Sequence, residues 1–291
     1  MIRQMITHDD ITQLPKIRFT GFSDIRQMPG AELIEALADS YHHVGLDDTI
    51  VVTRSNKRAN IFNQGIRNMV LDREEELSQG DILMIVKNNY YWMEEERKKL
   101  SEERRVKSEE FNGLANHKVP SSKFQVPSND IPAFLANGDR AKVLKVRRRI
   151  DLYGFRFATL LLQFPDYGNY ELEATVLLDT LTSEAPALTH DQQEQLFRQI
   201  EEDYQDVPLK ADRMKAIRQD QFYNALQVKF AYAVTCHKAQ GGQWAHVYVD
   251  QGYMTDDMLT PDYIHWLYTA FTRATEMLYL VNWPETQIET S

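Results

Sequence analysis

Residues 49–66, TIVVTRSNKRANIFNQGI, determine how the rest of the chain is interpreted. The run Thr49 to Thr53 is apolar and β-branched, which predicts a buried strand. Ser55 follows it and is a preferred N-cap for a helix. Apolar residues then recur at helical spacing at Ala59, Phe62, Ile66 and Met69, while Arg58, Asn63 and Arg67 point elsewhere. The segment predicts a strand, a turn and a helix, the unit from which α/β proteins are built.

The segments on either side extend this pattern. Before it, a helix is expected from about Pro29 to His43, with Gly45 ending it. The first 28 residues are polar and weakly periodic, and we interpret them as the continuation of a preceding segment. After it, a strand at 82–86 lies between turn residues, and further α/β elements return near the carboxyl end. These later elements are strands at 228–234, 246–250 and 277–281 and a helix opened by Thr260 and Pro261.

The middle of the chain has a different character. Residues 94–110 mix Glu, Lys and Arg densely, and a stretch rich in Pro and Ser follows, so we expect a domain boundary there. Three β-rich runs, at 141–150, 155–164 and 170–178, predict a small barrel or sheet. Helices are expected from Thr189, which forms a capping box with Gln192, and over 212–223. The predicted domains are 1–105 and 226–291, two parts of one α/β domain, with 106–225 inserted between them.

Composition limits the class of protein. The chain has 291 residues, a net charge of -10 and one cysteine, Cys236, so an internal disulfide is excluded. No apolar run is long enough to span a bilayer, and we expect a cytoplasmic protein. One stretch is strongly basic, and it is interpreted equally well as a charged strand edge or as a phosphate contact. Its members are Arg140, Lys142, Lys145, Arg147, Arg148 and Arg149.

Two kinds of site are missing from the sequence. No G-x-x-x-x-G-K-[ST] motif occurs, so the chain by itself is expected to bind ATP poorly. His42 and His43 are adjacent without a cluster of further ligands, and Cys236 cannot complete a zinc site, so no metal is expected.

The most unusual loop is Tyr232–Trp244, YAVTCHKAQGGQW, which leaves a predicted strand and ends in a Gly-Gly turn. Loops at the carboxyl ends of strands in open α/β sheets commonly bind ligands, and glycines let backbone N–H groups approach a phosphate. The same composition also describes an ordinary polar loop. The residues alone favour neither interpretation.

Three segments together resemble the superfamily 1 DNA helicases, and among them the RecD-like branch. Residues 231–244 resemble motif V, 267–274 (LYTAFTRA) resemble motif VI, and 51–60 stand where motif IV is expected. The resemblance runs from about residue 20 to 283. It implies an α/β fold of the RecA-like, P-loop-NTPase type, a second motor domain whose parallel sheet is flanked by helices. It also implies that residues 134–178 form an inserted small SH3-like β-barrel.

The resemblance implies roles for particular residues. Arg273 is expected to be an arginine finger for the γ-phosphate of ATP, the alternative being an arginine that interacts with a helix dipole. Gln240, Gly241 and Gln243 are expected at the nucleotide, although relatives have an acidic residue where this chain has Gln243. Arg54 or Arg58 is expected to approach a phosphate of the nucleotide, and the sequence does not choose between them. Single-stranded DNA contacts are expected from Thr235, His237, Lys238, Asn56 and Lys57.

The implied whole protein is an ATP-dependent DNA helicase. A preceding N-terminal RecA-like domain would supply the Walker motifs, ATP and Mg²⁺, so the present chain is expected to be inactive alone. The rival hypothesis is a stand-alone module that binds single-stranded nucleic acid. A nuclease, or a subunit associated with an exonuclease, ranks last, because no Asp/Glu-x-Lys cluster follows a predicted strand.

Overall fold

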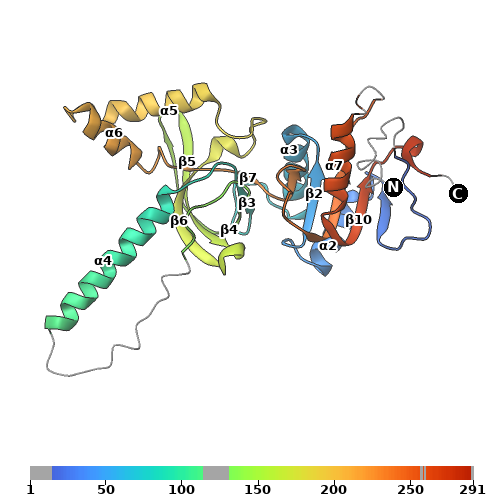
Figure 1. The fold of residues 1–291 in the computed structure, drawn as a ribbon, viewed down its shortest axis with the longest axis horizontal. Coiled ribbons are helices and arrows are strands. Elements are labelled where there is room, and N and C mark those ends of the chain that lie inside the picture. The colour runs from blue at the N-terminus through green and yellow to red at the C-terminus, as the bar shows by residue number, and fades with distance from the viewer. Residues whose placement is uncertain (1–14, 114–130, 256–257, 259, 290–291) are drawn as a thin grey trace. The chain divides into compact units, whose positions relative to one another are not determined.

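The computed structural model describes residues 15–113, 131–255, 258 and 260–289 (Figure 1). Contacts divide the chain into two compact units. Unit 1 consists of Met1–Glu76 and Phe230–Ser291, and unit 2 is Leu77–Lys229. An α/β unit interrupted by a β-rich one is therefore present, as the sequence predicts. The divisions after residues 76 and 229 differ from the predicted ones after 105 and 225.

Unit 1 contains a five-stranded sheet with the order β1-β10-β9-β2-β8, in which every pairing is parallel. Its strands are β1 (Ile25–Met28), β2 (Thr49–Thr53), β8 (Ala233–Thr235), β9 (Trp244–Asp250) and β10 (Ala274–Val281). Its helices are α2 (Leu33–His43), α3 (Asn56–Gly65) and α7 (Pro261–Phe271), with a π-helical turn at Ile66–Val70 and a 3-10 turn at Glu285–Gln287. All five residues of β2 are buried, because the strand lies inside the sheet and helices flank it. The predicted parallel sheet flanked by helices is confirmed.

Helix α3 begins as predicted, with the Ser55 hydroxyl accepting from the Arg58 N–H at 3.2 Å. Its second half corrects the predicted apolar face, because Asn63 and Arg67 are buried while Met69 is 70% exposed. The π-helical turn accounts for the exposure of Met69, since its i→i+5 bond, from Leu71 N–H to the Ile66 carbonyl, alters the direction of the side chains in this turn.

The two buried polar residues hold α3 against neighbouring segments of unit 1. The Asn63 amide donates to the carbonyls of Phe230 and Ala233 and accepts from the Ala233 N–H at 2.8 Å. The Arg67 guanidinium lies 4.4 Å from the centroid of the Phe230 ring and donates to the Glu75 carbonyl at 2.6 Å. Both side chains therefore replace apolar packing with satisfied polar contacts.

Unit 2 is built on a closed barrel, β3-β4-β5-β6-β7. The strands are β3 (Ile82–Ile85), β4 (Arg140–Leu152), β5 (Phe155–Phe164), β6 (Tyr170–Leu177) and β7 (Leu226–Phe230), with 3-10 turns at Pro165–Tyr167 and Leu178–Thr180. The three predicted β runs are confirmed as β4, β5 and β6. The predicted strand at 82–86 pairs with β4 and not with the parallel sheet, which moves the boundary to residue 77. The predicted strand at 228–234 is two strands, β7 in the barrel and β8 in the sheet.

Three helices accompany the barrel: α4 (Tyr91–Gly113), α5 (His190–Asp203) and α6 (Lys210–Arg218). The capping box of Thr189 and Gln192 that opens α5 is present as predicted. Helix α6 ends at Arg218, before the predicted Tyr223, because the Asp220 carboxylate accepts from the N–H groups of Phe222 and Tyr223 and forms a turn. Ile200 and Ile217, from α5 and α6, pack in one core cluster with Phe157 of β5.

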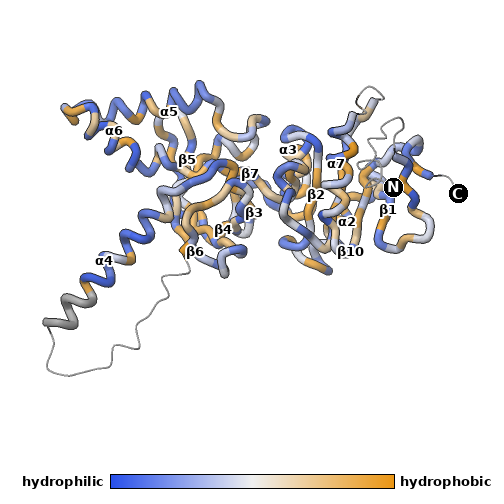
Figure 2. The backbone as a smooth tube through the Cα atoms, in the orientation of Figure 1, coloured by the Kyte–Doolittle hydropathy of each residue, from blue (hydrophilic) through white to orange (hydrophobic). Residues whose placement is uncertain are grey.

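Hydropathy along the backbone separates the core from the surface (Figure 2). The strands of the barrel and the sheet carry most of the hydrophobic residues, whereas α4 is hydrophilic over most of its coloured length. Helix α4 is anchored at its start, where Trp92 and Met93 are buried. None of the described helices is both long and apolar enough to cross a membrane.

The basic stretch lies on β4. Two irregularities in its pairing with β5, after Val143 and after Val146, break the alternation of buried and exposed residues. Arg147, Arg148 and Arg149 are therefore all exposed. Arg147 pairs with Glu173 at 3.2 Å, and Arg149 donates to the Leu77 carbonyl at 2.7 Å. A phosphate contact by this stretch stays a prediction.

Candidate functional site

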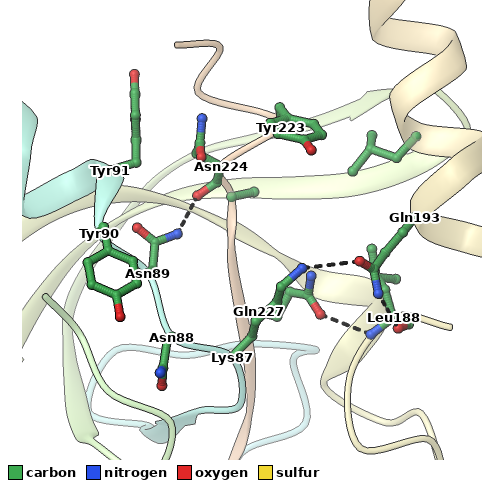
Figure 3. Close-up of a pocket in the computed structure, with 12 residues that line it drawn as sticks. Lys87, Asn88, Asn89, Tyr90, Tyr91, Leu188, Gln193, Tyr223, Asn224 and Gln227 are labelled. Atoms are coloured by element: carbon green, nitrogen blue, oxygen red, sulfur yellow. Dashed lines mark hydrogen bonds between the residues drawn. The ribbon is translucent and has the colours of Figure 1, made fainter. Parts of the chain in front are cut away.

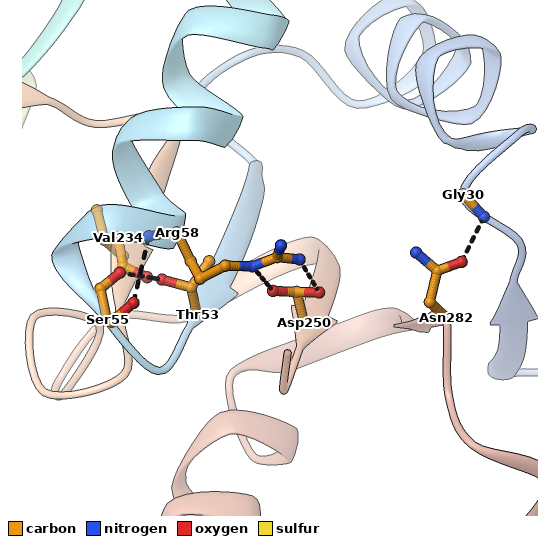
Figure 4. Close-up of polar contacts among 7 residues, drawn as sticks. All are labelled: Gly30, Thr53, Ser55, Arg58, Val234, Asp250 and Asn282. Atoms are coloured by element: carbon orange, nitrogen blue, oxygen red, sulfur yellow. Dashed lines mark hydrogen bonds and ion pairs between the residues drawn. The ribbon is translucent and has the colours of Figure 1, made fainter. Parts of the chain in front are cut away.

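The carboxyl ends of three neighbouring strands bring the motif IV and motif V segments together. Thr53, at the end of β2, pairs in register with Thr235 at the end of β8 and with Asp250 at the end of β9. The Thr53 hydroxyl is 3.1 Å from the Ser55 carbonyl and 3.4 Å from the Val234 carbonyl (Figure 4). The edge of the sheet therefore fixes where Arg54 and the first turn of α3 lie. Such an edge is the usual ligand side of an open parallel sheet.

Arg58 is engaged with an acidic residue that the sequence prediction missed. Its Nε and Nη2 atoms donate to the two oxygens of Asp250 at 2.8 and 2.7 Å (Figure 4). This hydrogen-bonded pairing raises the pKa of Arg58 above its usual value. The Asp250 side chain is 2% exposed and that of Arg58 is 41% exposed. The charge of Arg58 thus compensates a buried carboxylate. The available signal was an acidic residue placed directly at the end of a buried strand.

Arg54 has a different environment. It is exposed, and its guanidinium carbon lies 5.6 Å from the ring centroid of Tyr263 and 6.0 Å from that of Trp266, both on α7. It also contacts the sulfur of Met254. Cation–π contacts position the charge without neutralising it. Of the two arginines that the sequence left open, Arg54 is the one that lies against α7, while Arg58 faces Asp250.

The loop from Thr235 to Gly242 folds as a series of tight turns. The N–H groups of Lys238 and Ala239 donate to the Thr235 carbonyl at 2.9 and 3.1 Å, and that of Gly242 donates to the Ala239 carbonyl at 3.2 Å. Cys236 and Ala239 are buried on its inner side. Gly242 must stay small, because a Cβ there would lie 2.2 Å from the Trp244 ring.

The predicted ligand residues of this loop point mainly outward. His237, Gln240, Gly241 and Gln243 are exposed. Lys238 is partly buried, which lowers the pKa of its ammonium group. Asn56 and Lys57 lie in the first turn of α3, where Lys57 is exposed and Asn56 partly buried. These side chains are placed where a ligand from solvent can reach them.

Arg273 joins motif V to motif VI. Its Nη1 donates to the Gly242 carbonyl at 2.9 Å, and its Nε donates to the Thr269 carbonyl of α7, also at 2.9 Å. Nη2 donates to the Thr272 hydroxyl at 3.0 Å, and the Arg273 carbonyl accepts from the Trp244 N–H at 2.9 Å. These bonds use three of the five guanidinium N–H groups. The side chain is held in place and keeps donors for a further partner.

Helix α7 connects the three motifs. Arg54 lies over Tyr263 and Trp266, the Cys236 thiol is 3.6 Å from the Trp266 carbonyl, and Arg273 bonds to Thr269. Burial raises the pKa of the Cys236 thiol to about 11, and the positive charge of Arg273 opposes that rise. Two arginines and a neutral thiol therefore lie along one helix. Arg58, Asn56 and Lys57 lie instead at the start of α3, where Arg58 faces Asp250.

A helicase family matches the segment that contains these contacts. Residues 230–281, which hold β8, the loop, β9, α7 and β10, match the UvrD-like helicase C-terminal domain. Over these residues the chain is similar to the C-terminal domain of UvrD-like helicases. No curated protein matches the chain. Among solved structures, the Pif1 helicase from Candida albicans aligns at 14% identity with a TM-score of 0.28. That alignment covers 100% of this chain, which spans about half (51%) of the Pif1 chain.

Proposed function

We propose that this chain is the C-terminal part of an ATP-dependent DNA helicase of superfamily 1, from the RecD-like branch. Unit 1 is then the RecA-like second motor domain, and the barrel of unit 2 is the SH3-like insertion. A preceding N-terminal RecA-like domain would hold ATP and Mg²⁺, and hydrolysis of the bound ATP would supply the energy for unwinding. The observation that carries the proposal is the family match over the segment in which Arg273 links motif V to motif VI.

The geometry around Arg273 fits an arginine finger. A guanidinium stays charged at every physiological pH and has a planar fork of donors, which suits charge that develops on a transferring phosphoryl group. Bonds to the Gly242 and Thr269 carbonyls orient this fork before any ligand arrives. Preorganised donors stabilise a transition state more than mobile ones do. Gln240, Gly241 and Gln243 share the adjoining loop and would contribute on the nucleotide side.

The single-stranded DNA track would use the polar residues of the motif V loop and of the first turn of α3. Thr235, His237, Lys238, Asn56 and Lys57 are the proposed contacts. Hydroxyl, imidazole, ammonium and amide donors suit a phosphate backbone that is followed without regard to sequence. Arg54 is added to this group, because it follows β2 at the same edge as Thr235.

The test is ATP hydrolysis by the complete natural protein with Arg273 changed to Ala. Loss of an arginine finger lowers kcat by roughly 10³- to 10⁵-fold. Arg198→Ala is the matched control, because Arg198 is an exposed arginine of α5 that pairs with Glu194 on the surface of the helix. DNA binding is measured on both variants and is expected to persist. Equal ATPase rates in the two variants would remove the finger assignment and favour the stand-alone binding module.

A further inference from the structure

Unit 2 contains a pocket that the helicase assignment does not use. Its volume is about 240 Å³, and it lies where the end of β3, the start of α4, α5 and the segment before β7 converge (Figure 3). Three tyrosines, five carboxamides and Lys87 make up nearly all of its polar and aromatic lining, and no carboxylate is among the described residues that line it. Although the chain has 43 acidic residues, the only charged side chain of this lining is that of Lys87.

Gln227 presents a hydrogen-bond donor to this pocket. Its residue is 8% exposed, and its Oε1 accepts from the Leu188 N–H at 2.9 Å. That bond fixes which end of the amide is oxygen, because a backbone N–H needs an acceptor. Among the described residues, the Gln227 Nε2 has no hydrogen-bond partner, and the atom is not fully enclosed by protein. Buried polar groups are normally hydrogen-bonded, so the Gln227 amide donor indicates that a ligand in the pocket supplies an acceptor.

The tyrosines of the pocket offer aromatic rings for stacking and hydroxyl groups for hydrogen bonds. Tyr90 is 54% exposed and stacks on Phe134 at 4.8 Å, so its ring is held while much of it stays accessible. Tyr223 is 41% exposed and meets the edge of Phe197. In Figure 3, Asn89 and Asn224 lie between these two rings in the view. Burial, with Glu95 and Asp220 nearby, raises the pKa of the Tyr91 phenol above its usual value.

We propose that this pocket binds a single base of single-stranded DNA. The size excludes a large cofactor, since clefts for drug-sized ligands measure roughly 300–1,000 Å³. A base has a planar face for Tyr90 or Tyr223 and an edge with acceptors for the Gln227 amide. The amide groups of Asn89, Gln193 and Asn224 already donate to backbone carbonyls and hold the wall of the pocket in place. Lys87, which is exposed and donates to Gln193 at 3.1 Å, would attract the neighbouring phosphate. The choice of DNA over another ligand with a planar, hydrogen-bonding group rests on the proposed helicase function.

The experiment compares two labelled oligonucleotides of about 16 units by fluorescence anisotropy at fixed salt, one of thymidylate and one with abasic sites. The full chain is titrated as wild type and as Tyr90→Ala, Tyr223→Ala and their double variant. Tyr90→Phe keeps the ring, and Leu209→Ala removes an exposed apolar side chain elsewhere in unit 2. Gln227→Glu keeps the acceptor for Leu188 and removes the amide donor. Circular dichroism confirms that each variant is folded.

The pocket predicts that wild type prefers the thymidylate strand and that each Tyr→Ala change weakens its binding by roughly 5- to 150-fold. Binding to the abasic strand should hardly change, and Tyr90→Phe and Leu209→Ala should behave as wild type. If both strands bind equally well, or if the alanine variants keep the preference for bases, the pocket proposal is wrong while DNA binding by the motor unit stands. If neither strand binds at all, the proposed DNA track fails together with the pocket.

Discussion

Replacing Arg58 with Met should destabilise unit 1 far more than an ordinary surface substitution does. The change leaves the carboxylate of Asp250, which is 2% exposed, without the two guanidinium donors at 2.8 and 2.7 Å. Breaking a buried ion pair from one side costs about 3–5 kcal/mol. Because the Arg58 side chain is 41% exposed, water can reach the site, and we expect a loss of about 2–3 kcal/mol.

Urea unfolding followed by tryptophan fluorescence measures this loss, since three of the four tryptophans, Trp244, Trp266 and Trp283, belong to unit 1. With an m value of about 2 kcal/mol per M, the midpoint should fall by about 1 M or more. The control is Arg26→Met on β1, an exposed arginine that forms no ion pair with the described residues. Its expected effect is below about 0.5 kcal/mol.

A double-mutant cycle completes the test. Asp250→Asn removes the charge that needs compensation, so adding Arg58→Met to it should cost much less than Arg58→Met alone. If Arg58→Met loses no more stability than Arg26→Met, or if the two changes at 58 and 250 are additive, the carboxylate does not depend on Arg58 and the reasoning is refuted.

Three further outcomes are expected. Replacing Arg67 with Met should lower the free energy of unfolding by about 2 kcal/mol, because the Glu75 carbonyl loses its donor, and urea unfolding will measure it. A loss below that of Arg26→Met would contradict a structural role for the guanidinium. Burial lowers the pKa of His246, with His43 and Arg26 adding to the effect and Glu276 opposing it. The folded pKa therefore lies below the unfolded one, so stability is full above about pH 6.5 and falls as the solution is acidified through the folded pKa. His246→Gln should make the free energy of unfolding less dependent on pH between pH 8 and 5. An unchanged pH dependence would show that other groups cause the loss of stability in acid. Finally, a thiol with a pKa of about 11 is almost wholly protonated at pH 8, so Cys236 should react with a disulfide reagent roughly a hundredfold faster in urea than in the native chain. Rapid labelling of the native protein would show that the thiol is not buried.

The sequence predicts elements well where local chemistry defines them. The strand Thr49–Thr53 is predicted with its observed limits, because an apolar run ends at a residue that caps a helix. The capping box at Thr189 and the N-cap Thr260 with Pro261 mark two more helix starts. In each case the signal lies within a few residues of the boundary.

Elements that depend on distant partners were missed or merged. Strand β1 has four residues with only Met28 buried, and it owes its existence to pairing with β10. The run at 228–234, which predicts a single strand, gives no sign that the chain leaves the barrel at Phe230 and enters the sheet at Ala233. The partner of Arg58 is 192 residues away, a separation that no local pattern reveals.

The interrupted sheet has a consequence for synthesis on the ribosome. Among the described residues, the first segment of unit 1 contributes β1 and β2 to the sheet, and these strands are not neighbours, because β10 and β9 lie between them. They cannot pair until residues 230–281 have been made, after the roughly 150 residues of unit 2. Synthesis of these roughly 150 residues of unit 2 takes about 8–30 s at 5–20 residues per second. During that time the apolar strand Thr49–Thr53 has no partner, so the emerging chain should need a chaperone then, while the barrel can already fold.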